Sequence, residues 1–147
     1  MMVNENAPVV AKAEIEVAAD PEIIWEVLTD ISHWPSWNPE VKWASLDGEL
    51  AAGTGFRWKA GPGTIRSTIQ RIEHLRFLAW TGKTLGINAI HVWQLDSLEG
   101  KTIVRTEESW EGLIVRIFRR SLQKMLEKTT DDGLRHLKAE AERRSIH

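Results

Sequence analysis

The sequence predicts an α+β domain in which one antiparallel sheet packs against a long C-terminal helix. Residues 41–110 hold short apolar or alternating runs, separated by turn signals such as Asp47-Gly48 and Glu99-Gly100. After Gly112 the apolar residues instead recur about every 3.6 positions, which is typical of an amphipathic helix. The chain has 147 residues, so we expect a single domain over 1–147 with one core, ordered over about 10–142.

The first quarter of the chain predicts one strand and two short helices. Residues 1–8 are expected to form a poorly ordered end. Residues 11–17 alternate small or apolar with charged side chains, as a half-buried strand does. Asp20-Pro21-Glu22 then supplies a cap, a first-turn proline and a first-turn acid for a helix that ends near Thr29. A second short helix is expected at about residues 31–34.

Six more strands are expected, and their short links make neighbouring strands antiparallel. One face of the last strand carries Thr106 and Glu108 together with Trp110. In the strand before it, His91 and Trp93 share a face, and periodicity leaves open whether that face points inward. We expect these strands at 41–46, 55–60, 64–72, 76–81, 87–95 and 102–110, with one of the turns at Gly82-Lys83.

The last element is expected to be one continuous helix from Gly112 to about Arg144, roughly 45–50 Å long. Thr130-Asp131-Asp132-Gly133 could end it early, but the apolar stripe stays in phase across Gly133. One helix is too narrow to cover a strongly curved sheet of seven strands. We therefore expect an apolar cavity between sheet and helix, and the eight tryptophans suit its walls as well as they suit a core.

Five segments of the chain carry a resemblance to a known family: Ile24–Asp30, His33–Val41, His91–Leu95, Thr102–Gly112 and Gly133–Glu142. They resemble the START-related superfamily, also called SRPBCC, near its polyketide cyclase/dehydrase and lipid-transport branch. The resemblance extends over about residues 10–142 and implies a helix-grip fold, in which a curved antiparallel sheet encloses a cavity with the C-terminal helix. It also implies binding of apolar ligands, and in some members cyclisation, dehydration or hydrolysis.

Two groups of side chains are candidates for the cavity wall. The sheet and its loops would contribute mainly indoles, and the helix would contribute part of its apolar stripe. The alternative is that both groups are ordinary core packing. The candidate ligand-binding residues are Trp37, Trp58, Trp80, Trp93, Thr106, Phe118, Leu122, Met125 and Thr129.

Glu108 and His91 are the candidates for catalysis. A carboxyl group in apolar surroundings can act as an acid, and an imidazole titrates near neutrality and can act as an acid or a base. The alternatives are a solvated or ion-paired Glu108 after a slip in strand register, and a structural His91 whose hydrogen bonds are satisfied.

Other classes of function are disfavoured. The absence of cysteine excludes thiolate chemistry, and the five histidines lack metal-ligand spacing, so no metal and no cofactor is expected. A net charge of −2 disfavours nucleic acid as a partner. No apolar run approaches ~20 residues and no signal pattern starts the chain, so we expect no integral membrane segment and a cytoplasmic location. The basic face of the last helix is expected to be solvated, with contact to anionic membrane or RNA as its alternative, and the oligomeric state is undetermined.

The leading hypothesis is therefore a protein that binds a small hydrophobic or amphipathic molecule in the cavity, such as a lipid, polyketide, quinone or isoprenoid-like compound. The alternative is a polyketide cyclase or dehydratase that uses Glu108 and His91 for acid–base chemistry. A third possibility is an interaction module that binds a macromolecule. The two leading hypotheses differ in whether Glu108 and His91 lie within hydrogen-bond reach in one site.

Overall fold

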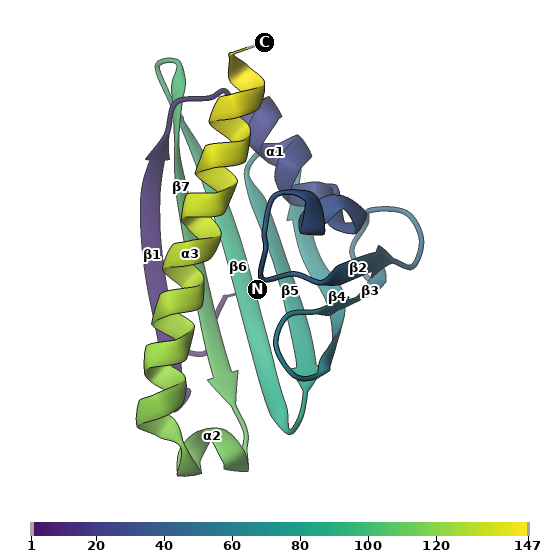
Figure 1. Cartoon of the computed structure of the whole chain (residues 1–147), viewed down its shortest axis with the longest axis vertical. Coiled ribbons are helices and arrows are strands. Elements are labelled where there is room, and N and C mark those ends of the chain that lie inside the picture. The colour runs from purple at the N-terminus through teal and green to yellow at the C-terminus, as the bar shows by residue number, and fades with distance from the viewer. Residues whose placement is uncertain (1, 147) are drawn as a thin grey trace.

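A computed structural model describes residues 2–146 (Figure 1), so Met1 and His147, the ends of the expected domain, lie outside the described residues. All seven strands form one antiparallel sheet in the order β1-β7-β6-β5-β4-β3-β2, which confirms the expected α+β helix-grip fold. The elements are β1 (Val9–Val17), α1 (Pro21–Thr29), η1 (Ile31–Ser36), β2 (Trp43–Leu46), β3 (Gly55–Lys59), β4 (Thr64–Glu73), β5 (Phe77–Thr84), β6 (Ile87–Leu98), β7 (Lys101–Glu111), α2 (Leu113–Ile117) and α3 (Arg119–Ser145).

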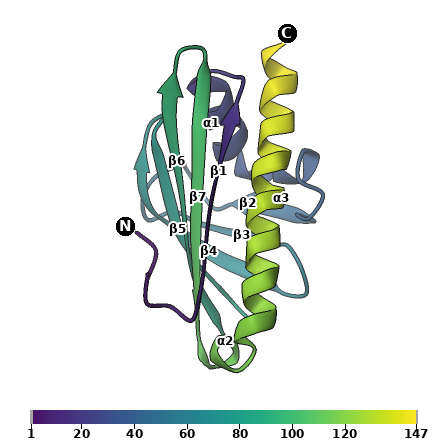
Figure 2. The same cartoon turned by 90° about the vertical axis from the view of Figure 1, so that its left-hand side faces the viewer.

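The long helix α3 lies along one side of the sheet rather than across its middle (Figures 1 and 2). It packs on β1, β7 and α1, and it buries Leu126, Leu134 and Leu137 there. Polar side chains also attach it to the backbone of the edge strand. Gln123 donates from Nε2 to the carbonyl of Val10 (2.8 Å) and accepts from its amide (3.2 Å). These bonds cover an edge that would otherwise be free to pair, and they hold α3 over β1 and β7 rather than over β3–β6.

The register of the sheet settles which face of β6 points inward. His91 pairs with Trp80 of β5 on one side and with Glu108 of β7 on the other. Trp93 likewise pairs with Thr106. Because directly paired residues project to the same side of a sheet, all five side chains belong to the concave face, as expected for Thr106 and Glu108.

The expected continuous helix from Gly112 is wrong, because the chain breaks at Phe118 between α2 and α3. The break allows Val115 of α2 and Leu126 of α3 to reach the same apolar cluster beside Val9. Helix α3 does continue unbroken through Gly133, as the in-phase stripe predicted.

The expected turn at Gly82-Lys83 is also wrong. The β5–β6 turn lies at Leu85-Gly86, where both residues have the positive φ that two-residue hairpin turns need. Gly82 instead sits inside β5, where an added Cβ would meet Ser67 and Ile65 at 3.2 and 3.3 Å. This glycine therefore marks close packing on the concave face and not a change of direction.

The N-terminal segment is not a loose end in residues 2–8. Val3 is buried on the convex face against Phe77, Ala79 and Val92. The amide of Asn4 donates to Ser109 Oγ (3.1 Å), so the segment is also attached to β7. Figure 2 shows it on the side of the sheet away from α3.

Candidate functional site

An aromatic cluster fills the concave face beneath η1. Trp34 of η1 inserts its ring between β3 and β5, with ring centroids 5.4 to 5.6 Å from Phe56, Trp58 and Trp80. The Trp34 indole N–H donates to the carbonyl of Leu28 (2.9 Å), which fixes the ring in place. This part of the expected cavity is thus occupied by the protein's own side chains.

His91 continues the cluster toward β7. Its ring lies 4.7 Å from the Trp80 ring and 5.1 Å from the Trp93 ring, measured between centroids. Its Nε2 lies 2.8 Å from Thr106 Oγ1, and its Nδ1 lies 3.2 Å from Glu108 Oε1. The two candidate catalytic residues therefore lie within hydrogen-bond reach of each other.

Glu108 is held from two sides. Trp110 donates its indole N–H to Oε2 (2.7 Å), and Oε1 faces His91. The side chain of Glu108 is 17% exposed and that of His91 is 13% exposed, so both are largely buried yet reachable from solvent. A ligand that enters this part of the concave face can meet a carboxylate oxygen directly.

The protonation of His91 follows from its surroundings. Burial lowers the pKa of His91, and the negative charge of Glu108 opposes that shift without cancelling it. The imidazole is therefore neutral near neutral pH and carries one proton. The Thr106 hydroxyl donates to the carbonyl of Val92 (3.2 Å), so its oxygen can accept from His91 Nε2, which we assign as the protonated nitrogen.

One flank of α3 forms the wall opposite this floor. Successive helical residues turn by about 100°, so Leu122, Met125 and Thr129 lie on the opposite flank from Gln123, which bonds to the edge strand β1. That flank faces the open side of the concave surface. Leu122 is half-buried, Met125 and Thr129 are exposed, and an added Cβ on Gly133 would meet nothing within 4 Å. Leu122 packs against the cluster of Val9, Ala11, Val115 and Leu126, as does Trp110, so the apolar wall and the aromatic floor come together at this end of α3.

The structure brings together most of the residues predicted from the sequence. Trp58, Trp80, Trp93, Thr106, His91 and Glu108 share the floor, although Thr106 is fully buried and contacts His91 rather than open space. Trp37 follows η1 and packs at the margin of the same core, and Phe118 lies at the α2–α3 break.

Sequence reasoning missed three contributors to this region. Trp34 is not among the residues predicted for the site, yet it fills the interior, and its position depends on a tertiary hydrogen bond that no local pattern signals. Trp110 is also outside the predicted set, although its alternation with Glu108 places both on one face. The third is Thr130. Its hydroxyl and the indole N–H of Trp93 are buried without a hydrogen-bond partner among residues 2–146.

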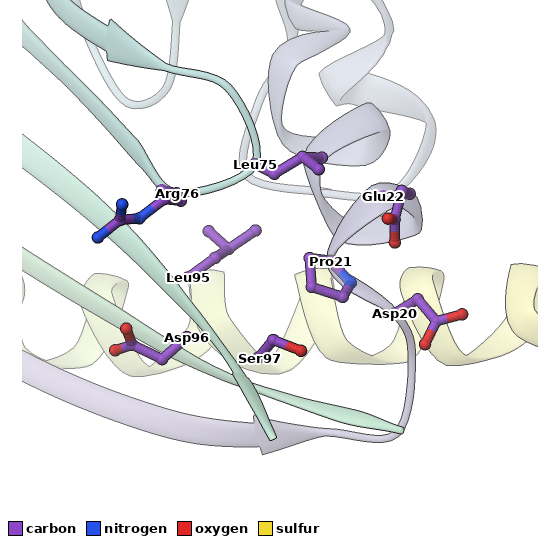
Figure 3. Close-up of a pocket in the computed structure, with 8 residues that line it drawn as sticks. All are labelled: Asp20, Pro21, Glu22, Leu75, Arg76, Leu95, Asp96 and Ser97. Atoms are coloured by element: carbon purple, nitrogen blue, oxygen red, sulfur yellow. The ribbon is translucent and has the colours of Figure 1, made fainter. Parts of the chain in front are cut away.

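Two surface hollows lie elsewhere on the molecule. The first, of about 580 Å³, lies where α1 begins near the ends of β5 and β6 (Figure 3). The second, of about 380 Å³, lies beside the β5–β6 turn. Neither is lined by a residue predicted for the site. The first hollow is lined by Asp20, Pro21, Glu22, Leu75, Arg76, Leu95, Asp96 and Ser97. The second is lined by residues 64, 66 and 83–88.

Two further kinds of site are absent from residues 2–146. No group of three or more His, Cys, Asp or Glu side chains in that range is arranged to hold a metal ion. Over the same range, every helix is too short or too polar to cross a bilayer.

Comparison with known proteins adds a family and a set of related folds. The family model described as polyketide cyclase/dehydrase and lipid transport matches residues 8–142. No match was found among curated proteins.

Solved structures share the fold at low sequence identity. A hypothetical protein of Helicobacter pylori superposes with a TM-score of 0.84 at 18% identity, over 95% of this chain and 91% of its own. The ZhuI aromatase/cyclase of a Streptomyces species superposes with a TM-score of 0.79 at 18% identity, over 92% of this chain and 94% of its own. A START superfamily protein of Mycobacterium smegmatis superposes with a TM-score of 0.70 at 19% identity, over 93% of this chain and 97% of its own. These structures share the fold, and the family match across nearly the whole sequence shows that the chain belongs to the polyketide cyclase/dehydrase and lipid transport family.

Proposed function

We propose that the protein binds a small hydrophobic or amphipathic molecule, such as a lipid, polyketide, quinone or isoprenoid-like compound, between the concave face and α3. The observation that carries the proposal is the partly exposed apolar flank of α3, with Leu122 and Met125, beside the concave face and its indoles, where a Cβ added to Gly133 would meet nothing within 4 Å. An apolar surface with a few placed polar groups is the usual make-up of a small-molecule site.

The polar groups of the concave face predict which hydrogen-bonding groups the ligand would carry. Glu108 offers accessible carboxylate oxygens to a hydroxyl or other donor. The Trp93 N–H, buried without a partner among residues 2–146, could donate a hydrogen bond to a carbonyl or ether oxygen of the ligand. These groups favour an apolar molecule with at least one oxygen over a pure hydrocarbon.

Tryptophan fluorescence tests this proposal. A panel of a fatty acid, a short-chain quinone, a naphthol and an isoprenoid alcohol should contain a compound that quenches indole emission saturably and raises the melting temperature. Met125→Glu should weaken that binding, because it places a charge on the apolar wall. Glu127→Gln, on an exposed face of the same helix, is the matched control. If no compound in such a panel binds saturably, the proposal is wrong.

A second candidate, acid–base catalysis of the cyclase or dehydratase type, is favoured by the 3.2 Å contact between His91 Nδ1 and Glu108 Oε1. In a dehydration, Glu108 would remove a proton from the carbon next to a carbonyl and then deliver that proton to the β-hydroxyl, which would leave as water as the carbon–carbon double bond forms. The indole N–H of Trp110 would hold the carboxylate in position during both transfers.

The test of catalysis uses an aromatic β-hydroxyketone, whose dehydration to the enone changes its ultraviolet absorbance. Glu108→Gln should lower the rate by about a hundredfold or more but retain saturable ligand quenching, because the glutamine amide oxygen can still accept a hydrogen bond from the ligand. A rate that does not change in this variant would remove Glu108 from the mechanism. A wild-type protein that binds the compound without turning it over would leave binding as the function.

A further inference from the structure

Exposed apolar side chains gather at one end of the molecule. Among residues 2–146, six of the ten large hydrophobic residues that are exposed lie on α2, at its break with α3, early on α3, or on the β5–β6 turn. Figure 1 shows α2 at the end opposite the C-terminus. The turn lies against α2, because a Cβ added to Gly86 would be 3.7 Å from Ile114 Cγ2. We name Leu85, Leu113, Ile114, Ile117 and Phe118 the α2 patch.

Cations surround the α2 patch, although the whole chain has a net charge of −2. Arg120 and Lys124 follow on the first turns of α3, and Arg66 and Lys83 line the hollow beside Leu85. None of these four forms an ion pair with another residue in the range 2–146. Arg116 is paired with Glu111, so the uncompensated charge at this end is positive.

We propose that this end of the molecule docks on the surface of an anionic lipid bilayer. The α2 patch would enter the boundary between headgroups and acyl chains, and the cations would lie at the level of the lipid phosphates. A short helix and a turn that project apolar side chains, with basic residues nearby, suit a bilayer surface, where acyl chains lie beneath anionic headgroups.

Other occupants fit these features less well. A second copy placed patch to patch would bring two sets of unpaired cations together, which is unfavourable. An acidic protein would satisfy the cations, but tight protein interfaces place their apolar anchors in pockets, and the α2 patch projects outward.

The docking surface is continuous with the proposed ligand site. Phe118 of the α2 patch is followed along the same flank of α3 by Leu122 and Met125. A hydrophobic molecule could thus pass between a bilayer and the concave face along apolar surface. This route rests on the proposed function, whereas docking itself does not.

Vesicle co-sedimentation at two salt concentrations tests the proposal on the full chain without added ligand. The protein should bind phosphatidylcholine vesicles that contain about one third phosphatidylglycerol, and bind pure phosphatidylcholine weakly. Leu113→Ser with Ile117→Ser should weaken binding by about tenfold, since both side chains are exposed and unpacked, at 74% and 65%. Arg120→Gln with Lys124→Gln should weaken it by about fivefold per charge, and added salt should do the same.

The matched control is Leu98→Ser with Ile146→Ser, which removes two exposed apolar side chains from the opposite end and should leave vesicle binding unchanged. The proposal is overturned if wild type ignores anionic vesicles, if both lipid mixtures bind equally, or if the α2 variant binds as wild type does. Capture by polyglutamate in place of vesicles would overturn it in favour of an acidic protein partner. Indole quenching by the ligand panel, measured on the same variants without vesicles, should not change, so the failure of one proposal is separable from the failure of the other.

Discussion

His91 and Glu108 are the residues at which the chemistry of the concave face can be measured most directly. Burial lowers the pKa of His91 and the Glu108 carboxylate partly restores it. Glu108→Gln should therefore lower the pKa of His91 further, because the opposing negative charge is lost. Titration of the His91 ring signals by NMR in both proteins measures this. The exposed His33 provides the internal control, and a His91 pKa that rises in the variant would contradict the assignment.

The same shift gives a pH dependence of stability. The His91 pKa in the folded protein lies below its ordinary value of 6.5, so the folded protein binds fewer protons than the unfolded chain. Stability from this source is complete above about pH 6.5 and is lost as pH falls through the folded pKa. His91→Gln should flatten that part of the curve of unfolding free energy against pH, measured with urea. An unchanged slope below pH 6.5 would show that His91 is not responsible.

Trp34 tests whether aromatic packing fills the concave face beneath η1. Trp34→Ala should cost about 3–5 kcal/mol in unfolding free energy, because the ring is buried against three aromatic neighbours. Trp43→Ala, at a 40% exposed indole on the edge strand β2, should cost about 1 kcal/mol or less. Urea unfolding measures both, and equal costs would contradict the packing described here.

At the scale of elements, the junction of α3 with α1 depends on Glu140. Its carboxylate accepts from Arg143 and from Arg144, each at 2.7 Å, and Arg144 also lies 3.9 Å from Glu26 of α1. The hydrogen bond from Arg143 is the larger cause, and with Arg144 it lowers the pKa of Glu140 to about 2.

Glu140→Gln should therefore lower the melting temperature near neutral pH. A carboxyl group with a depressed folded pKa stabilises the fold above its ordinary value of 4.5 and loses that effect as pH falls toward 2. The difference from wild type should shrink between pH 5 and pH 3 in thermal unfolding scans, whereas the control Glu127→Gln should not show this trend. A constant difference across this range would contradict the assigned ion pairs.

The sequence predicted the helices and strands better than the turns and breaks between them. Alternation placed Thr106 and Glu108 on the concave face, and the apolar stripe carried α3 through Gly133, because periodicity reports burial directly. It could not locate the break at Phe118, which depends on how Val115 meets the sheet. It also misplaced the β5–β6 turn, because Leu85 has no turn preference and Gly82 reflects packing.

At the scale of the whole molecule, the prediction of a ligand site depended mainly on the width of a curved seven-stranded sheet, which one helix is too narrow to cover. The sheet is curved and α3 does cover only one side of it (Figure 2). What no pattern could predict is that η1 returns to the sheet and inserts Trp34, since that depends on contacts between segments far apart in the chain. We therefore expect the ligand site toward β7 and the α3 flank, beside His91 and Glu108.

The most direct test of the central claim is NMR mapping of the indole N–H signals during titration with a compound from the ligand panel. Binding on the concave face should shift the signals of Trp58, Trp80, Trp93 and Trp110. The exposed Trp43 and the core residue Trp25, packed edge-on against His74, should be unaffected. Shifts confined to Trp43 or Trp25, or no saturable shift at any indole, would contradict a ligand site between the sheet and α3.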